Sequence, residues 1–227
     1  MSTLKFHKEI LTRILYDLVS ETGLAEILGF KGGTAVYFFY ELPRYSVDLD
    51  FDLLQEKFTG ENFVLIKNIL EKYGEIKDVY EKRYSVLFEI SYSDKTQNIK
   101  VEINKRNFGS EYEIKYLYGL PLKVMKKEDM FANKLVAMFE RECKVNRDIF
   151  DVYFFLDKGW EFNDKIIIKR TGFERKEFLL RLLKLLRKKN NARILSGLGD
   201  LLEDDLKKWV KLNLLKKTIF LLELKSA

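Results

Sequence analysis

The stretch that decides the fold is Ser46-Val47-Asp48-Leu49-Asp50-Phe51-Asp52-Leu53. Apolar and polar side chains alternate along it, and residues two apart in a β-strand project from the same face. We therefore expect a half-buried strand over residues 46–53, with Asp48 and Asp50 on one face and their Cα atoms roughly 6–7 Å apart. Two such carboxylates can converge on the divalent cations of a phosphoryl-transfer site. An isolated pair is more often the solvated face of an edge strand, so the neighbouring sequence decides between these interpretations.

A glycine turn lies just before this strand. Lys31-Gly32-Gly33-Thr34 stands where a loop is expected to enter a short helix over residues 33–40. Glycines at a helix N-terminus let backbone N–H groups approach a phosphate closely, and the helix dipole adds positive charge there. Arginine and serine side chains that follow can contact phosphate oxygens. The predicted nucleotide ligands are Gly32, Gly33, Thr34, Arg44 and Ser46, with Asp48 and Asp50 as ligands of Mg²⁺.

A third carboxylate is predicted on a neighbouring strand. Alternation returns over residues 84–92 and 98–104, joined by the turn-like Ser93-Asp94-Lys95, and this pattern indicates an antiparallel hairpin. Glu102 lies on the polar face of its second strand. Beside Asp48 and Asp50 it would complete a cluster that only cations can stabilise, act as a metal ligand and help to deprotonate an acceptor hydroxyl. The alternative is an exposed strand glutamate without a catalytic role.

Helical periodicity replaces strand patterns beyond Pro121. The predicted helices cover residues 128–141, 147–156, 174–189 and 206–222. We therefore expect an α+β protein with a mixed sheet flanked by helices over residues 1–120. A helical carboxy-terminal domain over residues 121–227 would complete the active site.

Two charged residues of the predicted carboxy-terminal helices are candidates for the site. Lys134 stands between apolar neighbours, where its amine could reach a core-side pocket and balance triphosphate charge; the alternative is a lysine that extends to solvent. Asp148 follows near a helix start, where it could anchor Lys134 or a substrate ribose, or simply favour the helix dipole.

Composition sets further limits. The chain has 227 residues, a formal charge of +6, one cysteine and one histidine. A single Cys143 excludes an intrachain disulfide and favours the reducing cytoplasm. A single histidine excludes a histidine-cluster metal site, and His7 is expected on the surface. The positive charge weakly favours a polyanionic partner such as RNA. No secretory signal or membrane span is expected.

At this point the sequence resembles the AbiEii/AbiGii-type nucleotidyltransferase toxins, which include MenT-like enzymes. The first motif of that family resembles Lys31-Gly32-Gly33-Thr34-Ala35 together with Arg44-Tyr45-Ser46-Val47-Asp48-Leu49-Asp50-Phe51. Val101-Glu102-Ile103 is similar to the second motif, which often has Asp where this chain has Glu102. The helix of Lys134 is similar to the third motif and Arg147-Asp148-Ile149-Phe150-Asp151 to the fourth.

The resemblance covers residues 29–156 and implies a DNA polymerase β-like minimal nucleotidyltransferase core. It also implies Mg²⁺, an NTP substrate, a toxin–antitoxin or phage-defence role with an antitoxin partner, and in some members addition of nucleotides to the 3′ end of tRNA. We therefore predict a nucleotidyltransferase that transfers NMP to an RNA 3′ hydroxyl and releases pyrophosphate. Nucleotidylation of a protein, or a catalytically silent module that binds a nucleotide or a partner, are the alternatives.

Overall fold

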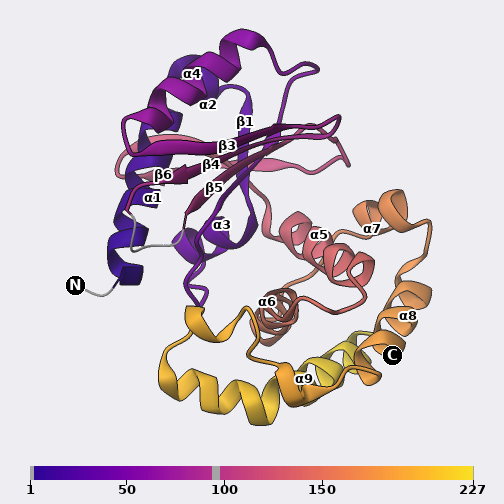
Figure 1. Cartoon of the computed structure of the whole chain (residues 1–227). Helices are drawn as coiled ribbons and strands as arrows, with labels where there is room; N and C mark the ends of the chain where they lie inside the picture. Colours follow the sequence, from indigo (N-terminus) through magenta and orange to yellow (C-terminus); the bar gives the residue numbers. More distant parts are fainter. Residues whose placement is uncertain (1–2, 94–97, 227) are drawn as a thin grey trace. The chain divides into compact units, whose positions relative to one another are not determined.

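The computed structural model describes residues 3–93 and 98–226 (Figure 1). The chain forms two compact units. The first comprises Met1–Glu41, Tyr45–Asn107 and Glu111–Met125, and the second comprises Leu42–Arg44, Phe108–Ser110 and Lys126–Ala227. The sheet thus continues past Pro121, where the sequence predicts that strands end, and two short segments of the first half belong to the second unit.

Within the described residues, the first unit contains a seven-stranded mixed sheet of order β3-β4-β5-β2-β1-β7-β6. β1 pairs with β7 and β2 with β5 in parallel, and the remaining pairs are antiparallel. The strands are β1 (Leu28–Lys31), β2 (Leu49–Leu53), β3 (Glu75–Glu81), β4 (Ser85–Ser91), β5 (Ile99–Asn104), β6 (Tyr112–Leu117) and β7 (Leu120–Met125). An α+β protein with a mixed sheet is therefore confirmed.

β2 lies in the middle of the sheet, between β1 and β5. Its apolar Leu49, Phe51 and Leu53 are buried, as the alternation predicts. The strand begins at Leu49 rather than at residue 46, so Asp48 lies immediately before it. The alternative interpretation, an edge strand with a solvated acidic face, is wrong, because β2 has a neighbouring strand on each side.

Antiparallel hairpins lie on both sides of this centre. The antiparallel pair β4–β5 is confirmed, although residues 94 and 95 of its predicted turn lie outside the described residues. The pair β6–β7 was not predicted. Its two-residue connection, Tyr118 and Gly119, has φ angles of 49° and 87°, which is the left-handed geometry of a tight hairpin turn.

Four helices of the first unit are described: α1 (Thr3–Ser20), α2 (Thr22–Ala25), α3 (Gly32–Phe39) and α4 (Gly60–Glu71). α3 confirms the short helix that the sequence predicts over residues 33–40. α3 follows β1 directly and packs against β1 and β2. The start of α3 is therefore held at the ends of the two strands that carry the glycine turn and the acidic residues.

The second unit is helical over its described residues. Its elements are α5 (Lys127–Glu140), α6 (Asn146–Asp157), α7 (Asp164–Thr171), α8 (Arg175–Arg187), the short helices η1 (Asn191–Arg193) and η2 (Gly199–Leu201), and α9 (Asp204–Ser226). α6 packs against α5 and α9, and α8 packs against α9. The four predicted helices are confirmed, and α7 is an additional one.

Candidate functional site

The carboxylate of Asp50 lies against the glycine turn. Gly32 has a φ of +77°, and a Cβ atom added to it would stand 2.2 Å from Asp50 Oδ2. A real Cβ essentially never comes that close to another atom, so the carboxylate occupies the space that a side chain at position 32 would need. Lys31 and Asp50 are also paired across β1 and β2. The first turn of α3 and the acidic strand are thus held in direct contact, as predicted.

Thr34 fixes the chain that leads into β2. Its side chain is fully buried, and its hydroxyl donates to the backbone carbonyl of Asp48. The hydroxyl oxygens of Thr34 and Ser46 are 2.9 Å apart, and Ser46 donates because a hydroxyl has one proton. Thr34 therefore positions Asp48 and Ser46 relative to α3. This contact supports a positioning role for Thr34.

Glu102 is the neighbour of Asp50 in the sheet. β5 runs parallel to β2, and Glu102 is paired with Asp50 across these strands. Paired residues lie about 4.8 Å apart at their backbones and project from the same face. Both side chains are half-buried, as is Asp48. Glu102 is therefore next to Asp50, as its predicted role requires.

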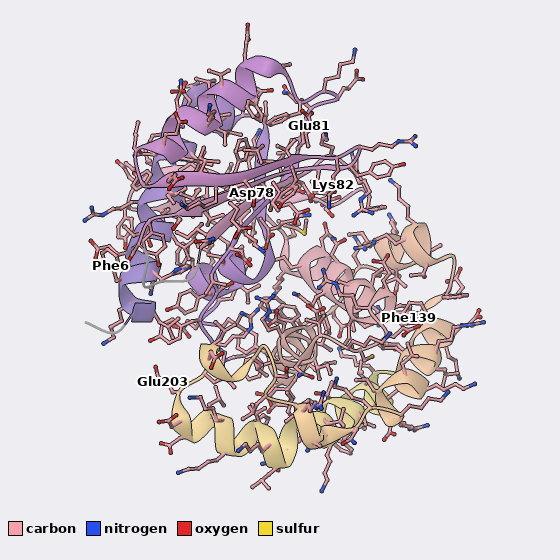
Figure 2. All side chains as sticks on the ribbon, in the orientation of Figure 1. Phe6, Asp78, Glu81, Lys82, Phe139 and Glu203 are labelled. Carbon is pink, nitrogen blue, oxygen red and sulfur yellow. The ribbon has the colours of Figure 1, made fainter. Side chains whose placement is uncertain are left out.

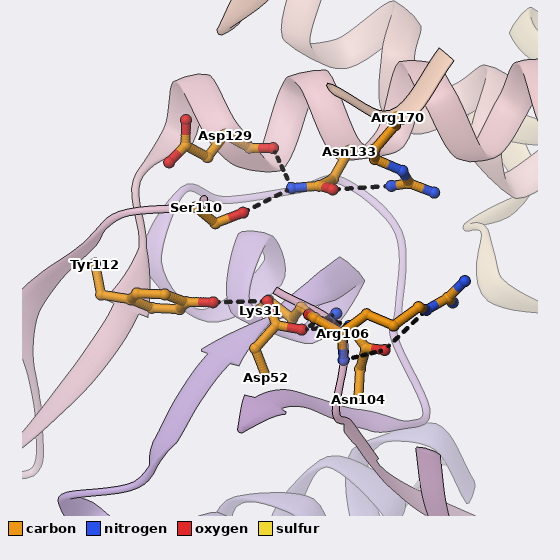
Figure 3. Close-up of polar contacts among 9 residues, drawn as sticks. All are labelled: Lys31, Asp52, Asn104, Arg106, Ser110, Tyr112, Asp129, Asn133 and Arg170. Atoms are coloured by element: carbon orange, nitrogen blue, oxygen red, sulfur yellow. Dashed lines mark hydrogen bonds and ion pairs between the residues drawn. The ribbon is translucent and has the colours of Figure 1, made fainter. Parts of the chain in front are cut away.

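Asp52 belongs to a different, closed network (Figure 3). Its Oδ1 accepts from Lys31 Nζ at 2.5 Å and from Asn104 Nδ2 at 2.8 Å, and its Oδ2 accepts from Tyr112 OH at 2.6 Å. The tyrosine ring lies over Gly29, whose missing side chain leaves room for it. Asp52 is buried, with 8% of its surface exposed. The three donors satisfy its carboxylate within the protein. Asp52 therefore braces the sheet beside the candidate site.

His7 is buried, so its predicted surface position is wrong. Its side chain is 3% exposed, Nε2 donates to the carbonyl of Val47 at 3.0 Å, and Nδ1 accepts from Tyr92 OH at 2.6 Å. Burial lowers the pKa of His7, and the bond to Val47 and the charge of Asp48 offset it only in part. A neutral His7 thus anchors α1 to the segment that ends at Asp48.

The acidic residues of the first unit suit Mg²⁺ better than a metal that needs a complete protein cage. Among residues 3–93 and 98–226, no group of three or more His, Cys, Asp or Glu side chains is arranged to hold a metal ion. Mg²⁺ is usually bound through one or two carboxylates, with waters and substrate phosphates as its other ligands. Asp50 beside Gly32, with Asp48 two residues before it, fits this requirement.

The second unit contains a buried cluster of ion pairs. Arg44 binds Asp151 through two bonds, Nε to Oδ1 at 2.6 Å and Nη2 to Oδ2 at 2.7 Å. Lys134 Nζ is 3.0 Å from both Asp148 Oδ1 and Asp151 Oδ2, and Arg141 Nη1 lies 2.9 Å from Asp148 Oδ2. Asp148 thus anchors Lys134, which was one of its two predicted roles. The guanidinium of Arg44, a predicted phosphate ligand, is bonded to Asp151.

The charges in this cluster stabilise one another. Burial favours a raised pKa for Asp151, but the charges and hydrogen bonds of Arg44 and Lys134 outweigh it and hold the pKa below its usual value. Burial lowers the pKa of Lys134, but the carboxylates of Asp151 and Asp148 outweigh burial and raise that pKa. Asp151 and Lys134 are therefore both charged at neutral pH. Lys134 keeps 20% of its side chain exposed, so the alternative of a fully solvated lysine does not describe it.

A second polar network in this unit joins α5 to α7 (Figure 3). Asn133 Nδ2 donates to Ser110 Oγ at 3.1 Å and to the carbonyl of Asp129 at 2.9 Å. Arg170 Nη1 donates to Asn133 Oδ1 at 2.8 Å, and its guanidinium lies over the ring of Phe108. The segment Phe108–Ser110 is thereby fastened to the helices of the second unit.

The spacing of two acidic residues in the sequence could have predicted the ion-pair cluster. Asp148 and Asp151 are three residues apart and therefore lie on one face of a helix, together with the buried Val152 and Phe155. Carboxylates on an apolar face need cationic partners. For Asp52, Asn104 and Tyr112 no comparable signal exists, since they come from three separate strands.

Comparison with known proteins relates the whole chain to nucleotidyltransferases. A family model described as nucleotidyl transferase AbiEii toxin of a type IV toxin–antitoxin system matches residues 13–210. The crystal structure of a candidate nucleotidyltransferase from H. pylori is 22% identical, with a TM-score of 0.64, over 100% of this chain and 96% of that chain. The crystal structure of JHP933 from Helicobacter pylori is 21% identical, with a TM-score of 0.62, over 100% and 93%. No curated protein matches the chain. No described helix is long and apolar enough to cross a membrane.

Proposed function

Because the chain belongs to the AbiEii family of nucleotidyl transferase toxins, we propose that it transfers a nucleoside monophosphate from an NTP to the 3′ hydroxyl of an RNA, with tRNA as the expected acceptor. Mg²⁺ is the proposed cofactor, pyrophosphate is the second product, and the cytoplasm is the proposed compartment. Membership of a toxin–antitoxin family implies an antitoxin partner, and a toxin–antitoxin or phage-defence system is the proposed setting. The contact between Asp50 and Gly32 carries the proposal, because it unites a carboxylate with a phosphate-binding helix start.

The proposed reaction divides its work among residues of the first unit. Asp48 and Asp50 would hold Mg²⁺, which when bound supplies positive charge to the triphosphate oxygens. The backbone at Gly32 and Gly33 would bind the phosphates at the start of α3. Glu102 would accept the proton of the acceptor hydroxyl. The acceptor oxygen then forms a bond to the α-phosphorus as the α–β bridging P–O bond breaks, and pyrophosphate leaves.

The side chains of Thr34 and Ser46 would position the proposed metal ligands. The two hydroxyls contact each other, and that of Thr34 also donates to the Asp48 carbonyl, so Ser46 lies close to the proposed metal ligands. The proposed role of Lys134 is to balance the charge of the triphosphate, because Asp151 and Asp148 keep its amine protonated. The proposed role of Asp148 is to orient that amine.

The test is incubation with each of the four α-labelled NTPs, total tRNA and Mg²⁺. We expect label in tRNA that RNase removes and protease does not. Label that protease removes would establish protein nucleotidylation instead. Binding of Mg–NTP without label in any macromolecule would favour a silent module. The matched variant is Asp50→Asn, with Glu89→Gln as its control, because Glu89 is also a half-buried carboxylate on the same face of the sheet.

A further inference from the structure

Basic side chains surround an exposed tyrosine at the turn between β3 and β4. The turn contains Lys82, Arg83 and Tyr84, and Lys105 and Arg106 follow β5 beside it. We call these five residues the Tyr84 patch. Figure 2 shows Glu81 and Lys82 close together at the end of the β3–β4 hairpin. All five residues belong to the first unit, so the patch lies on the same body as Asp50.

Tyr84 is stacked with guanidinium groups and still reaches solvent. The guanidinium carbon of Arg83 is 5.0 Å from the centre of the Tyr84 ring, and that of Arg106 is 5.6 Å away. The tyrosine is nevertheless 48% exposed. Aromatic rings and guanidinium planes are the two flat surfaces on which proteins stack unpaired RNA bases.

The patch is positively charged. It contains four cationic side chains, of which Lys105 lies 3.4 Å from the carboxylate of Glu81. The side chains of Lys82, Arg83 and Arg106 are exposed. A polyanion would gain affinity from each phosphate that these cations neutralise, through the release of counterions. An acidic protein could use the charge as well, but it would make no comparable use of the stacked Tyr84.

Hydrogen bonds connect the patch to Asp52, which lies beside the candidate site. The backbone N–H and Nε–H of Arg106 both donate to Asn104 Oδ1 at 3.3 Å. Asn104 in turn donates to Asp52 through its side-chain amide. Asp52 and Asn104 lie two residues further along β2 and β5 than Asp50 and Glu102, a distance of about 7 Å. A strand of RNA whose 3′ end reaches the carboxylates could therefore also lie on the patch.

We propose that the Tyr84 patch binds the single-stranded part of the RNA acceptor, with a base stacked on Tyr84 and phosphates on Lys82, Arg83 and Arg106. The inference rests on the proposed function, because it assumes that the acceptor is RNA. The patch would bind the acceptor at a place separate from the nucleotide. Tyr84 is thus an acceptor-binding residue, and its loss should leave the use of NTP unchanged.

The test measures binding of fluorescein-labelled tRNA and of a labelled single-stranded oligonucleotide by fluorescence anisotropy. Tyr84→Ala should weaken binding by about 5- to 140-fold, as expected for the loss of one stacked base. Tyr84→Phe should bind as wild type. Tyr116→Ala is the control, because Tyr116 is 69% exposed and lies on β6, at the other edge of the sheet.

The charges are tested by salt dependence. Arg83→Gln combined with Arg106→Gln should reduce the slope of log affinity against log salt by about 1.4, because each phosphate of a single strand that a cation neutralises contributes about 0.7 to that slope. Lys67→Gln combined with Lys72→Gln removes the same charge near the end of α4 and should leave the slope unchanged. Thermal melting of each variant verifies that it is folded.

The transfer assay separates this inference from the proposed function. If the inference holds, Tyr84→Ala raises the KM for tRNA about as much as it weakens binding and leaves the KM for NTP unchanged. If tRNA is labelled, but Tyr84→Ala and the double arginine variant bind it as wild type does, the inference is overturned and the proposed function stands. The inference is also overturned if wild type binds no RNA at low salt, or if the patch variants lose binding to a protein acceptor but not to RNA. In either case, the presence or absence of label in tRNA tests the proposed function separately.

Discussion

Asp50 and Asp151 are carboxylates in two different environments. Asp151 is fully buried and receives bonds from Arg44 and Lys134, which satisfy it completely within the protein. Asp50 is half-buried and lies against Gly32, at the helix start that we propose as the phosphate-binding turn. The comparison shows how the charge of a carboxylate can serve either stability or chemistry. A paired and buried acid holds the fold, whereas an acid beside an anion-binding turn can hold a metal ion for a phosphorylated substrate.

The largest effect is expected from breaking the buried pair. Asp151→Asn leaves the charges of Arg44 and Lys134 without their shared partner and should reduce the free energy of unfolding by about 3–5 kcal/mol. Urea denaturation followed by circular dichroism measures it. Asp205→Asn is the control, because Asp205 is fully exposed and 3.6 Å from Lys208, and it should leave stability close to that of wild type. A variant of Asp151 as stable as that control would refute a structural role for the pair.

The second effect concerns catalysis. Asp50→Asn should lower the rate of nucleotide transfer roughly 100- to 1000-fold, because a neutral amide binds Mg²⁺ poorly. The stability of this variant should be close to that of wild type, in contrast to Asp151→Asn. Single-turnover transfer at saturating NTP measures the rate. Transfer at the rate of the Glu89→Gln control would remove Asp50 from the reaction.

A smaller effect is expected at the glycine turn. Gly32→Ala should cost about 1–2 kcal/mol of stability because of its positive φ, and its Cβ would displace the Asp50 carboxylate. Transfer should therefore fall as well. Gly60→Ala is the control, since a Cβ there meets nothing within 4 Å. Full activity in Gly32→Ala would show that the contact with Asp50 is dispensable.

The smallest effect is a dependence of stability on pH. The pKa of Asp151 is lowered from its ordinary value of 3.8, so its contribution is present above that value and is lost as the pH falls through the folded pKa. The difference in unfolding free energy between wild type and Asp151→Asn should shrink between about pH 5 and the acid limit of folding. Urea titrations at several pH values measure this difference. A difference independent of pH would mean that folding does not change the pKa of Asp151, which would contradict the lowered pKa.

Alternation in the sequence predicted β2, β4 and β5 correctly. Leu49, Phe51 and Leu53 identify β2 because apolar and polar residues alternate along it. The neighbouring β1 was missed because Leu28–Lys31 is too short to show a period. β3 was missed because nearly all of its residues are exposed. Strand pairing between distant segments is set by packing of the whole sheet, which no local pattern contains.

The sequence likewise predicted some contacts of the candidate site and missed others. The proximity of Gly32 and Asp50 followed from a motif within one short span of sequence, and the pairing of Glu102 with Asp50 was predicted only as a condition. The β6–β7 hairpin was missed, although Tyr118-Gly119 between alternating residues is a turn signal. Pro121, which we interpreted as the end of the strands, lies within β7. Long-range partners, such as Arg44 for Asp151, cannot be read from spacing.

The central claim is that Asp48 and Asp50 hold Mg²⁺ for a nucleotide bound at the start of α3. Its most direct test is calorimetric titration of a non-hydrolysable NTP analogue into wild type and into Asp48→Asn combined with Asp50→Asn, each with and without Mg²⁺. We expect tight binding by wild type only with Mg²⁺, and loss of that Mg²⁺-dependent gain in the folded double variant. Equal Mg²⁺-dependent affinity in both proteins would contradict the account.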